Sequence, residues 1–224
     1  DNVIIDGQQK GYIFEITNST TLTLNGLTLT NGIGKNLNIE GYNVTVGGAI
    51  VSYGNLNFFN TSFINNKADV GGAIFTQNAS ISGSKSIFKD NLATINGGSI
   101  DLIYSNININ SSIFVNNTDS NGKNSIVGYE NNYTIDYNWW GTNDPRSKTI
   151  KEHSLENLAN NWIIMDLSLN NSTLTATLNK VENTTNDISP LPSSMMLPSV
   201  NVTFNSLSST INPTSNITDS NDVS

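Results

Sequence analysis

The chain has 224 residues, a net charge of −8 and an isoelectric point near 4.4, and only 12% of its residues are charged. This balance argues against binding to nucleic acid or to an anionic membrane surface, because both need clustered Lys and Arg. The chain has no Cys, which excludes disulfides and thiolate chemistry. No apolar run approaches the roughly 18 residues that a membrane helix needs.

Alternating apolar residues begin near residue 11 and predict short strands with one buried face. The first such set is Leu22, Leu24 and Leu29. The longest predicted loop, Asn31 to Val46, follows, and we expect it to be a variable feature of the chain.

A repeated motif dominates residues 47–117. Its glycine part occurs at Gly47-Gly48-Ala49-Ile50, Gly71-Gly72-Ala73-Ile74 and Gly97-Gly98-Ser99-Ile100, with spacings of 24 and 26 residues. Each copy is followed by an aromatic residue and, three positions later, an Asn, in the pairs Phe63 and Asn66, Phe88 and Asn91, and Phe114 and Asn117. Between these landmarks, Leu56 and Phe58 align with Ile81 and Gly83 and with Ile107 and Ile109. Weaker copies place Leu22, Leu24 and Leu29, and later Tyr133, Ile135 and Trp140, in the same slots, with Asn143 after the last.

This spacing predicts an all-β fold, a right-handed parallel β-helix of about five coils between residues 11 and 145. Coils stacked roughly 4.8 Å apart would align Leu29, Phe63, Phe88, Phe114 and Trp140 in one column. Asn66, Asn91 and Asn117 would form a second column at a turn, because Asn tolerates left-handed backbone and its amide bonds the amides above and below. The paired glycines are expected to turn the chain at positive φ. A leucine-rich solenoid has a similar period, but its Leu-x-x-Leu-x-Leu pattern is absent.

The ordered pair Gly-Gly-Ala-Ile and Phe-x-x-Asn resembles the repeats of chlamydial polymorphic outer-membrane proteins. The segment Tyr137 to Pro145, which contains Trp139 and Trp140, resembles the element that closes the β-helix in Asn/Thr-rich adhesin-like surface proteins of methanogenic archaea. An immunoglobulin-like β-domain often follows the helix in those proteins. The resemblance covers about residues 1–205. It implies an extracellular cell-surface protein of adhesin type and brings no catalytic residues.

The chain is therefore predicted to divide into a β-helix over residues 1–146 with a C-terminal Trp-Trp cap, a connector over 147–161, and a partial immunoglobulin-like sandwich with a polar tail over 162–224. Capping is favoured over a sugar-stacking platform for the two Trp residues, because Trp140 falls in the core register. The connector holds one helix-like stretch, Ile150 to Leu158. Later strands are expected around Ile163 to Leu169, Leu174 to Leu178 and Val200 to Phe204, the last after a Pro-rich loop from Pro190 to Pro198. The end of the chain from Thr210 is expected to be polar and frayed.

The main alternative function is that of a carbohydrate-active β-helix enzyme, either a polysaccharide lyase or a glycoside hydrolase. A glycosidase needs two carboxylates facing one cleft. The acids of the predicted helix fall in different slots and are expected to be solvated turn residues: Asp69, Asp90, Asp101, Asp119, Glu130 and Asp136. The lone Arg146 and His153 lie outside the predicted stack, and no metal-binding or nucleotide-binding motif occurs. The sequence therefore predicts no enzyme, no catalytic, cofactor-binding or metal-binding residues, and no cofactor.

Candidate N-glycosylation acceptors are abundant, as expected by chance in a chain this rich in Asn, Ser and Thr. They include Asn18, Asn43, Asn60, Asn78, Asn110, Asn116, Asn132, Asn171, Asn183, Asn201 and Asn216. Asn60 and Asn110 are expected within strands, which makes them poorer acceptors if they face inward. We expect non-catalytic display and attachment to host cells, other microbes or glycans. The expected partner is a glycan or protein on another cell surface, with no nucleic acid and no membrane insertion.

Overall fold

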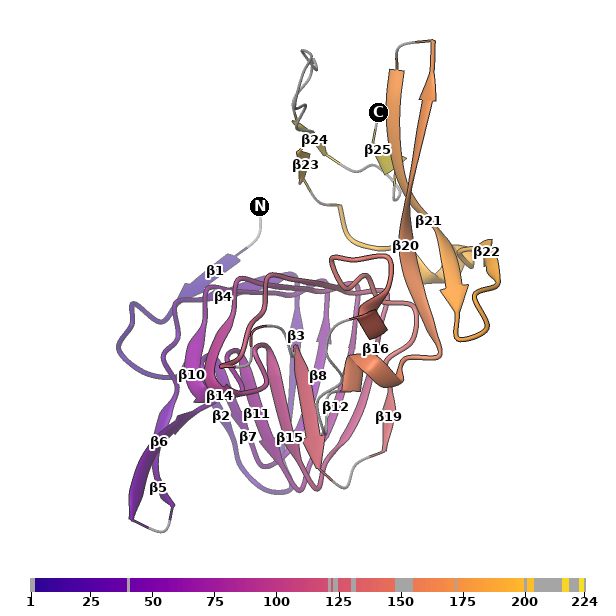
Figure 1. Ribbon diagram of the computed structural model, residues 1–224. Coiled ribbons are helices and arrows are strands. Elements are labelled where there is room, and N and C mark those ends of the chain that lie inside the picture. The colour runs from indigo at the N-terminus through magenta and orange to yellow at the C-terminus, as the bar shows by residue number, and fades with distance from the viewer. Residues whose placement is uncertain are drawn as a thin grey trace.

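The computed structural model describes residues 3–39, 41–120, 122, 125–129, 132–147, 155–171, 173–199, 201–203, 215–217 and 222–223. Its larger part is a parallel β-solenoid of about five coils, as predicted, and a long antiparallel hairpin rises from the C-terminal end of the stack (Figure 1). All regular structure in the described residues consists of strands and three short 3-10 turns.

Each coil contributes one strand to each of three parallel sheets. Sheet A consists of β1 (Val3–Asp6), β4 (Leu27–Thr30), β9 (Ser62–Ile64), β13 (Ile87–Lys89) and β17 (Ile113–Val115). Sheet B consists of β2 (Phe14–Ile16), β7 (Ile50–Ser52), β11 (Ile74–Gln77), β15 (Ile100–Ile103) and β18 (Ile126–Tyr129). Sheet C consists of β3 (Thr21–Asn25), β8 (Asn55–Phe59), β12 (Ser80–Ser84), β16 (Asn106–Asn110) and β19 (Tyr133–Thr134).

The predicted aromatic column is confirmed. Leu29 pairs in register with Phe63, Phe63 with Phe88, and Phe88 with Phe114. The rings of Phe63, Phe88 and Phe114 stack with centroids 4.7 Å apart, and Trp140 continues the stack 4.6 Å beyond Phe114. The predicted alignments in sheet C are also confirmed, although Tyr133, at the last coil, remains 40% exposed.

The predicted asparagine ladder is confirmed, with one correction to its backbone. Asn91 Nδ2 donates to the carbonyl of Phe63 (2.9 Å) and to Oδ1 of Asn117 (2.8 Å). Asn91 Oδ1 accepts from the backbone N–H of Asn66 (3.0 Å) and from its side chain (3.1 Å). The left-handed residue of each turn is the one before the ladder Asn, at Asn65, Asp90 and Asn116, with φ between 55° and 58°. The ladder side chains point inward from the next position and are almost fully buried.

The paired glycines turn the chain as predicted and also allow close stacking. The first of each pair has φ between 59° and 66°. A Cβ on Gly48 would lie 2.0 Å from the carbonyl oxygen of Gly72, and one on Gly72 would lie 2.1 Å from that of Gly98. Because no side chain fits at these distances, the second glycine is required by packing between coils.

The predicted loop from Asn31 to Val46 is a β-hairpin, which corrects that expectation. Its strands are β5 (Lys35–Ile39) and β6 (Tyr42–Val46), and Figure 1 shows it projecting from the stack. Through β6 it joins β10 (Lys67–Val70) and β14 (Leu92–Asn96) in sheet D. Sheet D packs on the outer side of sheet B, where Val46, Val51 and Phe75 form a second buried cluster. Both faces of sheet B are therefore covered.

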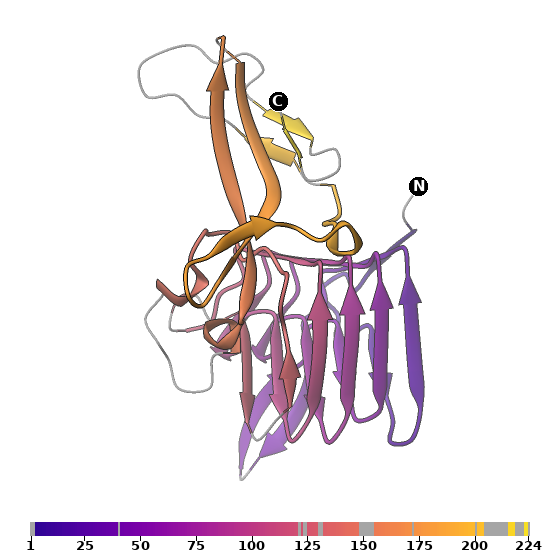
Figure 2. The same cartoon turned by 90° about the vertical axis from the view of Figure 1, so that its right-hand side faces the viewer.

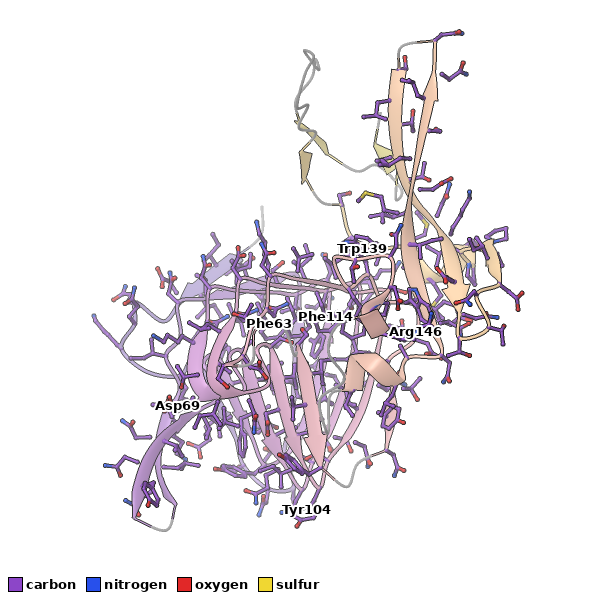
Figure 3. The ribbon with its side chains drawn as sticks, viewed as in Figure 1. Phe63, Asp69, Tyr104, Phe114, Trp139 and Arg146 are labelled. Atoms are coloured by element: carbon purple, nitrogen blue, oxygen red, sulfur yellow. The ribbon has the colours of Figure 1, made fainter. Side chains whose placement is uncertain are left out.

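The C-terminal end of the stack is closed by more than the two predicted Trp residues. Trp140 belongs to the main core together with Leu155, Ala159 and Trp162. Trp139 faces the other way, because successive strand residues point to opposite sides. It packs with Ile113, Ile163 and Leu178 between sheet A and the hairpin, and Figure 3 shows it on that side of the stack. The two Trp residues therefore pack into two different hydrophobic clusters.

The remaining described chain is antiparallel. Strand β20 (Asn161–Asn170) pairs with β21 (Thr173–Asn183), which also pairs with β22 (Ile188–Pro190) and β25 (Asp222–Val223). A separate pair joins β23 (Asn201–Thr203) and β24 (Ser215–Ile217). The described strands confirm an antiparallel sheet at the place of the predicted sandwich.

Some predictions meet a different structure or fall outside the described residues. Of the predicted helix from Ile150 to Leu158, the described part is a 3-10 turn at Leu155–Leu158. The Pro-rich loop contains a further 3-10 turn at Ser193–Met195. Val200, Phe204, His153, Glu130 and the end from Thr210 up to residue 214 lie outside the described residues.

Candidate functional site

The three outer faces of the solenoid differ in what covers them. Sheet D covers the outer face of sheet B. The hairpin β20–β21 and the segment around Leu197 cover the outer face of sheet A at its C-terminal end. The outer face of sheet C carries exposed and half-exposed side chains along its strands, and Figure 2 shows this sheet turned toward the viewer. Sheet C therefore offers an open surface on which a ligand can lie.

The outward side chains of sheet C are aligned and uncharged. Parallel pairing places them in rows that cross the strands: Thr21, Asn55, Ser80 and Asn106; Thr23, Asn57, Ser82, Asn108 and Thr134; and Asn25, Phe59, Ser84 and Asn110. None of them carries a charge. Neighbouring members of a row lie about 4.8 Å apart, and neighbouring rows lie about 6.6 Å apart, because side chains on one face are two residues apart. The result is a regular lattice of amides and hydroxyls.

A hollow crosses this lattice over the C-terminal parts of β3, β8 and β12 and reaches Asn110 of β16. The outward residues of β12 are serines, which are shorter than the residues on the neighbouring strands β8 and β16. The hollow has a volume of about 310 Å³ and is lined by residues of four coils, among them Asn57, Phe59, Ser82 and Asn110. Phe59, which lines the hollow, is 44% exposed, and Lys85 Nζ lies 5.8 Å from the centroid of its ring.

Three of the predicted acids have structural hydrogen bonds in separate places. Asp69 accepts from the backbone N–H of Thr45 (2.8 Å) and from the hydroxyl of Thr94, and these bonds hold its pKa below the usual range. Asp90 accepts from Asn116 (3.1 Å) at a turn. Asp136 accepts from the backbone N–H groups of residues 160 (2.7 Å) and 161 (3.2 Å), where it secures the start of β20.

Two of the predicted acids are not solvated turn residues, and this corrects the sequence interpretation. Asp119 is buried, with 5% of its surface exposed, and Asp101 is 1% exposed in the middle of β15. Asp101 stands in register with Phe75 and Val127 on the outer side of sheet B. Burial raises its pKa to about 7, and its Oδ2 has no hydrogen-bond partner. Asp101 therefore keeps its proton to a much higher pH than an exposed carboxyl group does.

The lone Arg146 has a structural position at the junction between the stack and the antiparallel sheet. Its guanidinium lies 4.3 Å from the ring centroid of Trp162 and donates to Asp144 (3.1 Å) and Asn186 (3.1 Å). Figure 3 shows Arg146 at the base of the hairpin. Within the described ranges, no three carboxylate or imidazole groups gather closely enough to hold a metal ion. The same ranges contain no helix long and apolar enough to cross a membrane.

Most candidate glycosylation acceptors lie at exposed corners. Asn18, Asn43, Asn78, Asn116, Asn132 and Asn171 are exposed. Asn60 is an exposed turn residue with φ 48°, so its expected place inside a strand is wrong. Asn110 ends β16 on the outer face and is half-buried. The side chains of Asn201 and Asn216 lie outside the described residues.

No protein-family model, curated protein or solved structure matches this chain. The functional argument therefore rests on the surface chemistry of the solenoid.

Sequence reasoning overlooked the hollow on sheet C, although its signal was present. The segments Asn55 to Phe59, Ser80 to Ser84 and Asn106 to Asn110 align without gaps, and their outward positions read Asn-Asn-Phe, Ser-Ser-Ser and Asn-Asn-Asn. A strand whose outward residues are all small, beside strands with larger outward residues, predicts a depression in the surface at that strand.

Proposed function

We propose that the chain is part of an extracellular cell-surface protein of adhesin type, which attaches without catalysis to glycans or proteins on other cells. The observation that carries this proposal is the open, uncharged outer face of sheet C. Amides and hydroxyls both donate and accept hydrogen bonds, so such a face suits neutral polar partners. Each contact contributes little, and many copies at one cell surface would provide firm attachment.

The positions of the carboxylates support attachment over catalysis. Catalysis of glycoside cleavage needs a positioned acid and a second carboxylate at one cleft. Asp69, Asp90 and Asp136 instead hold turns and strand ends at separate places in the fold. Asp101 has the raised pKa of a general acid, but only 1% of its surface is exposed, which leaves a substrate no access to its carboxyl group.

The proposal also includes the immunoglobulin-like domain and the archaeal origin that the sequence suggests. We infer that the antiparallel sheet around β20 and β21 is part of an immunoglobulin-like domain. The Trp-Trp segment and the repeats resemble those of methanogen adhesin-like proteins, which supports an archaeal cell surface as the location.

Adhesion of coated beads tests the proposed function. Beads that carry many copies of the chain should bind to cells or to glycan-coated surfaces, whereas the free chain should bind weakly. The chain should release no new reducing ends or unsaturated products from the same polysaccharides, with or without calcium. Absence of bead binding on every surface, or turnover that disappears when one carboxylate is replaced, would refute attachment without catalysis.

A further inference from the structure

The hollow on sheet C is a groove that runs across the strands. Its polar and aromatic lining comes from Thr23 and Asn25 of β3, Asn57 and Phe59 of β8, Ser82 and Ser84 of β12, and Asn110 of β16. Four strands at about 4.8 Å spacing extend about 14 Å, and the lining positions of one strand extend about 7 Å. These dimensions suit one extended polymer chain that crosses the strands.

The lining residues indicate which class of polymer the groove would bind. Serine hydroxyls and asparagine amides donate and accept, and therefore pair with hydroxyl groups that also do both. The exposed ring of Phe59 offers an apolar surface to the C–H face of a sugar ring, in the usual combination of one aromatic contact with a few polar ones. The lining residues carry no charge, and Lys85 beside Phe59 is a single cation, which cannot balance the repeated desolvated charges of a polyanion.

A peptide strand fits the groove less well. The hollow lies on the face of sheet C, and the backbones of β8 and β12 beneath it are each paired on both sides. A peptide would have to meet side chains alone, without the main-chain hydrogen bonds that give strand addition its affinity. Lys85 stands at one end of the groove, with its Nζ 5.8 Å from the centroid of the Phe59 ring, and holds that ring from one side.

We propose that this groove binds a single chain of a neutral polysaccharide, which crosses β3, β8 and β12 with one sugar ring against Phe59. The inference rests on the proposed attachment function and names its ligand class and its site. The serines of β12 and the asparagines of β3, β8 and β16 bind hydroxyl groups, and Phe59 sets the position of the polysaccharide.

Bead binding to immobilised polysaccharides tests this site. The probes are cellulose, chitin and mannan as neutral polymers, and polygalacturonate and heparin as polyanions. Ser82→Glu fills the groove with a charged side chain, and Thr21→Glu places the same side chain on the same face, outside the groove, as the matched control. Phe59→Ala removes the ring, and Phe59→Trp retains an aromatic surface. Circular dichroism and the unfolding midpoint confirm that each variant is folded.

We expect wild-type beads to bind at least one neutral polymer. Ser82→Glu and Phe59→Ala should weaken that binding by about tenfold or more, as expected for the loss of a central contact, while Thr21→Glu and Phe59→Trp retain it. If beads attach to cells or glycans equally well with and without Ser82→Glu, the groove is not the site, and the attachment function stands. Preferential binding to polyanions or peptides would also overturn the inference. If wild-type beads attach to nothing, both proposals fail.

Discussion

Replacement of Asp101 by Asn should change how the stability of the solenoid depends on pH. The carboxyl group is buried on the outer side of sheet B, between Phe75 and Val127 of the neighbouring strands. Its burial raises the pKa from 3.8 to about 7 without help from a charged neighbour. In the unfolded chain the same group ionises at its ordinary pKa.

The sign and the size of the pH effect on the free energy of unfolding follow from this difference in pKa. Below about pH 4 the group is protonated in both states, and the native protein carries no penalty. Between about pH 4 and pH 7 the unfolded state releases the proton while the native state retains it, so the free energy of unfolding falls as pH rises. A shift from 3.8 to about 7, at about 1.4 kcal/mol for each pH unit, corresponds to about 4 kcal/mol. Well above pH 7 the group is ionised in both states, and the free energy of unfolding falls no further.

Urea unfolding of the wild type and of Asp101→Asn between about pH 4 and pH 8 measures this effect. The wild type should lose about 4 kcal/mol relative to the variant across that range, because groups such as Asp69 titrate equally in both proteins and cancel. Parallel pH profiles for the wild type and Asp101→Asn would show that Asp101 is not buried as described.

Three further changes test the stack itself. Phe88→Ala removes a fully buried ring and should lower the free energy of unfolding by about 3–5 kcal/mol, whereas Phe59→Ala, on the surface, should cost far less; equal losses would contradict the register. Asn91→Leu removes four ladder hydrogen bonds and should cost about 4 kcal/mol by urea unfolding; a neutral result would show that the ladder adds no stability. Gly72→Ala places a methyl group 2.1 Å from the oxygen of Gly98 and should prevent folding, as measured by loss of β-structure in circular dichroism; a folded variant would mean that the coils can separate there.

The repeat made the solenoid predictable, because one slot was visible several times. Phe63, Phe88 and Phe114 recur at nearly constant spacing, and three copies fix a register that a single strand leaves open. The same holds for the asparagine ladder. The hairpin at β5 and β6 occurs once, and without a second copy its strands read as a loop.

The burial of Asp101 was harder to predict, because alternation identifies two faces of a strand without showing that both are covered. A signal was nevertheless present. The slots aligned with Asp101 hold Val51, Phe75 and Val127, and apolar residues on both faces of a strand are typical of a sheet buried on both sides. The partner that buries them, sheet D, follows from the chain path and not from the composition of β15.

Trp139 and Trp140 show a second feature that the local sequence does not predict. Adjacent residues in a strand face opposite sides, so only Trp140 could continue the aromatic column. The cluster around Trp139 depends on the hairpin that returns over sheet A, and local sequence at the Trp pair carries no information about that return.

The salt dependence of adhesion tests the uncharged attachment surface most directly. Beads coated with the chain are bound to a neutral polysaccharide surface while the salt concentration is raised from 0.01 M to 1 M, which shortens the Debye length from about 30 Å to about 3 Å. Because the outer face of sheet C carries no charge, bead binding should stay within about twofold across this range. Binding that is strong at low salt and lost at high salt would place the attachment on charged residues elsewhere and contradict the proposed surface.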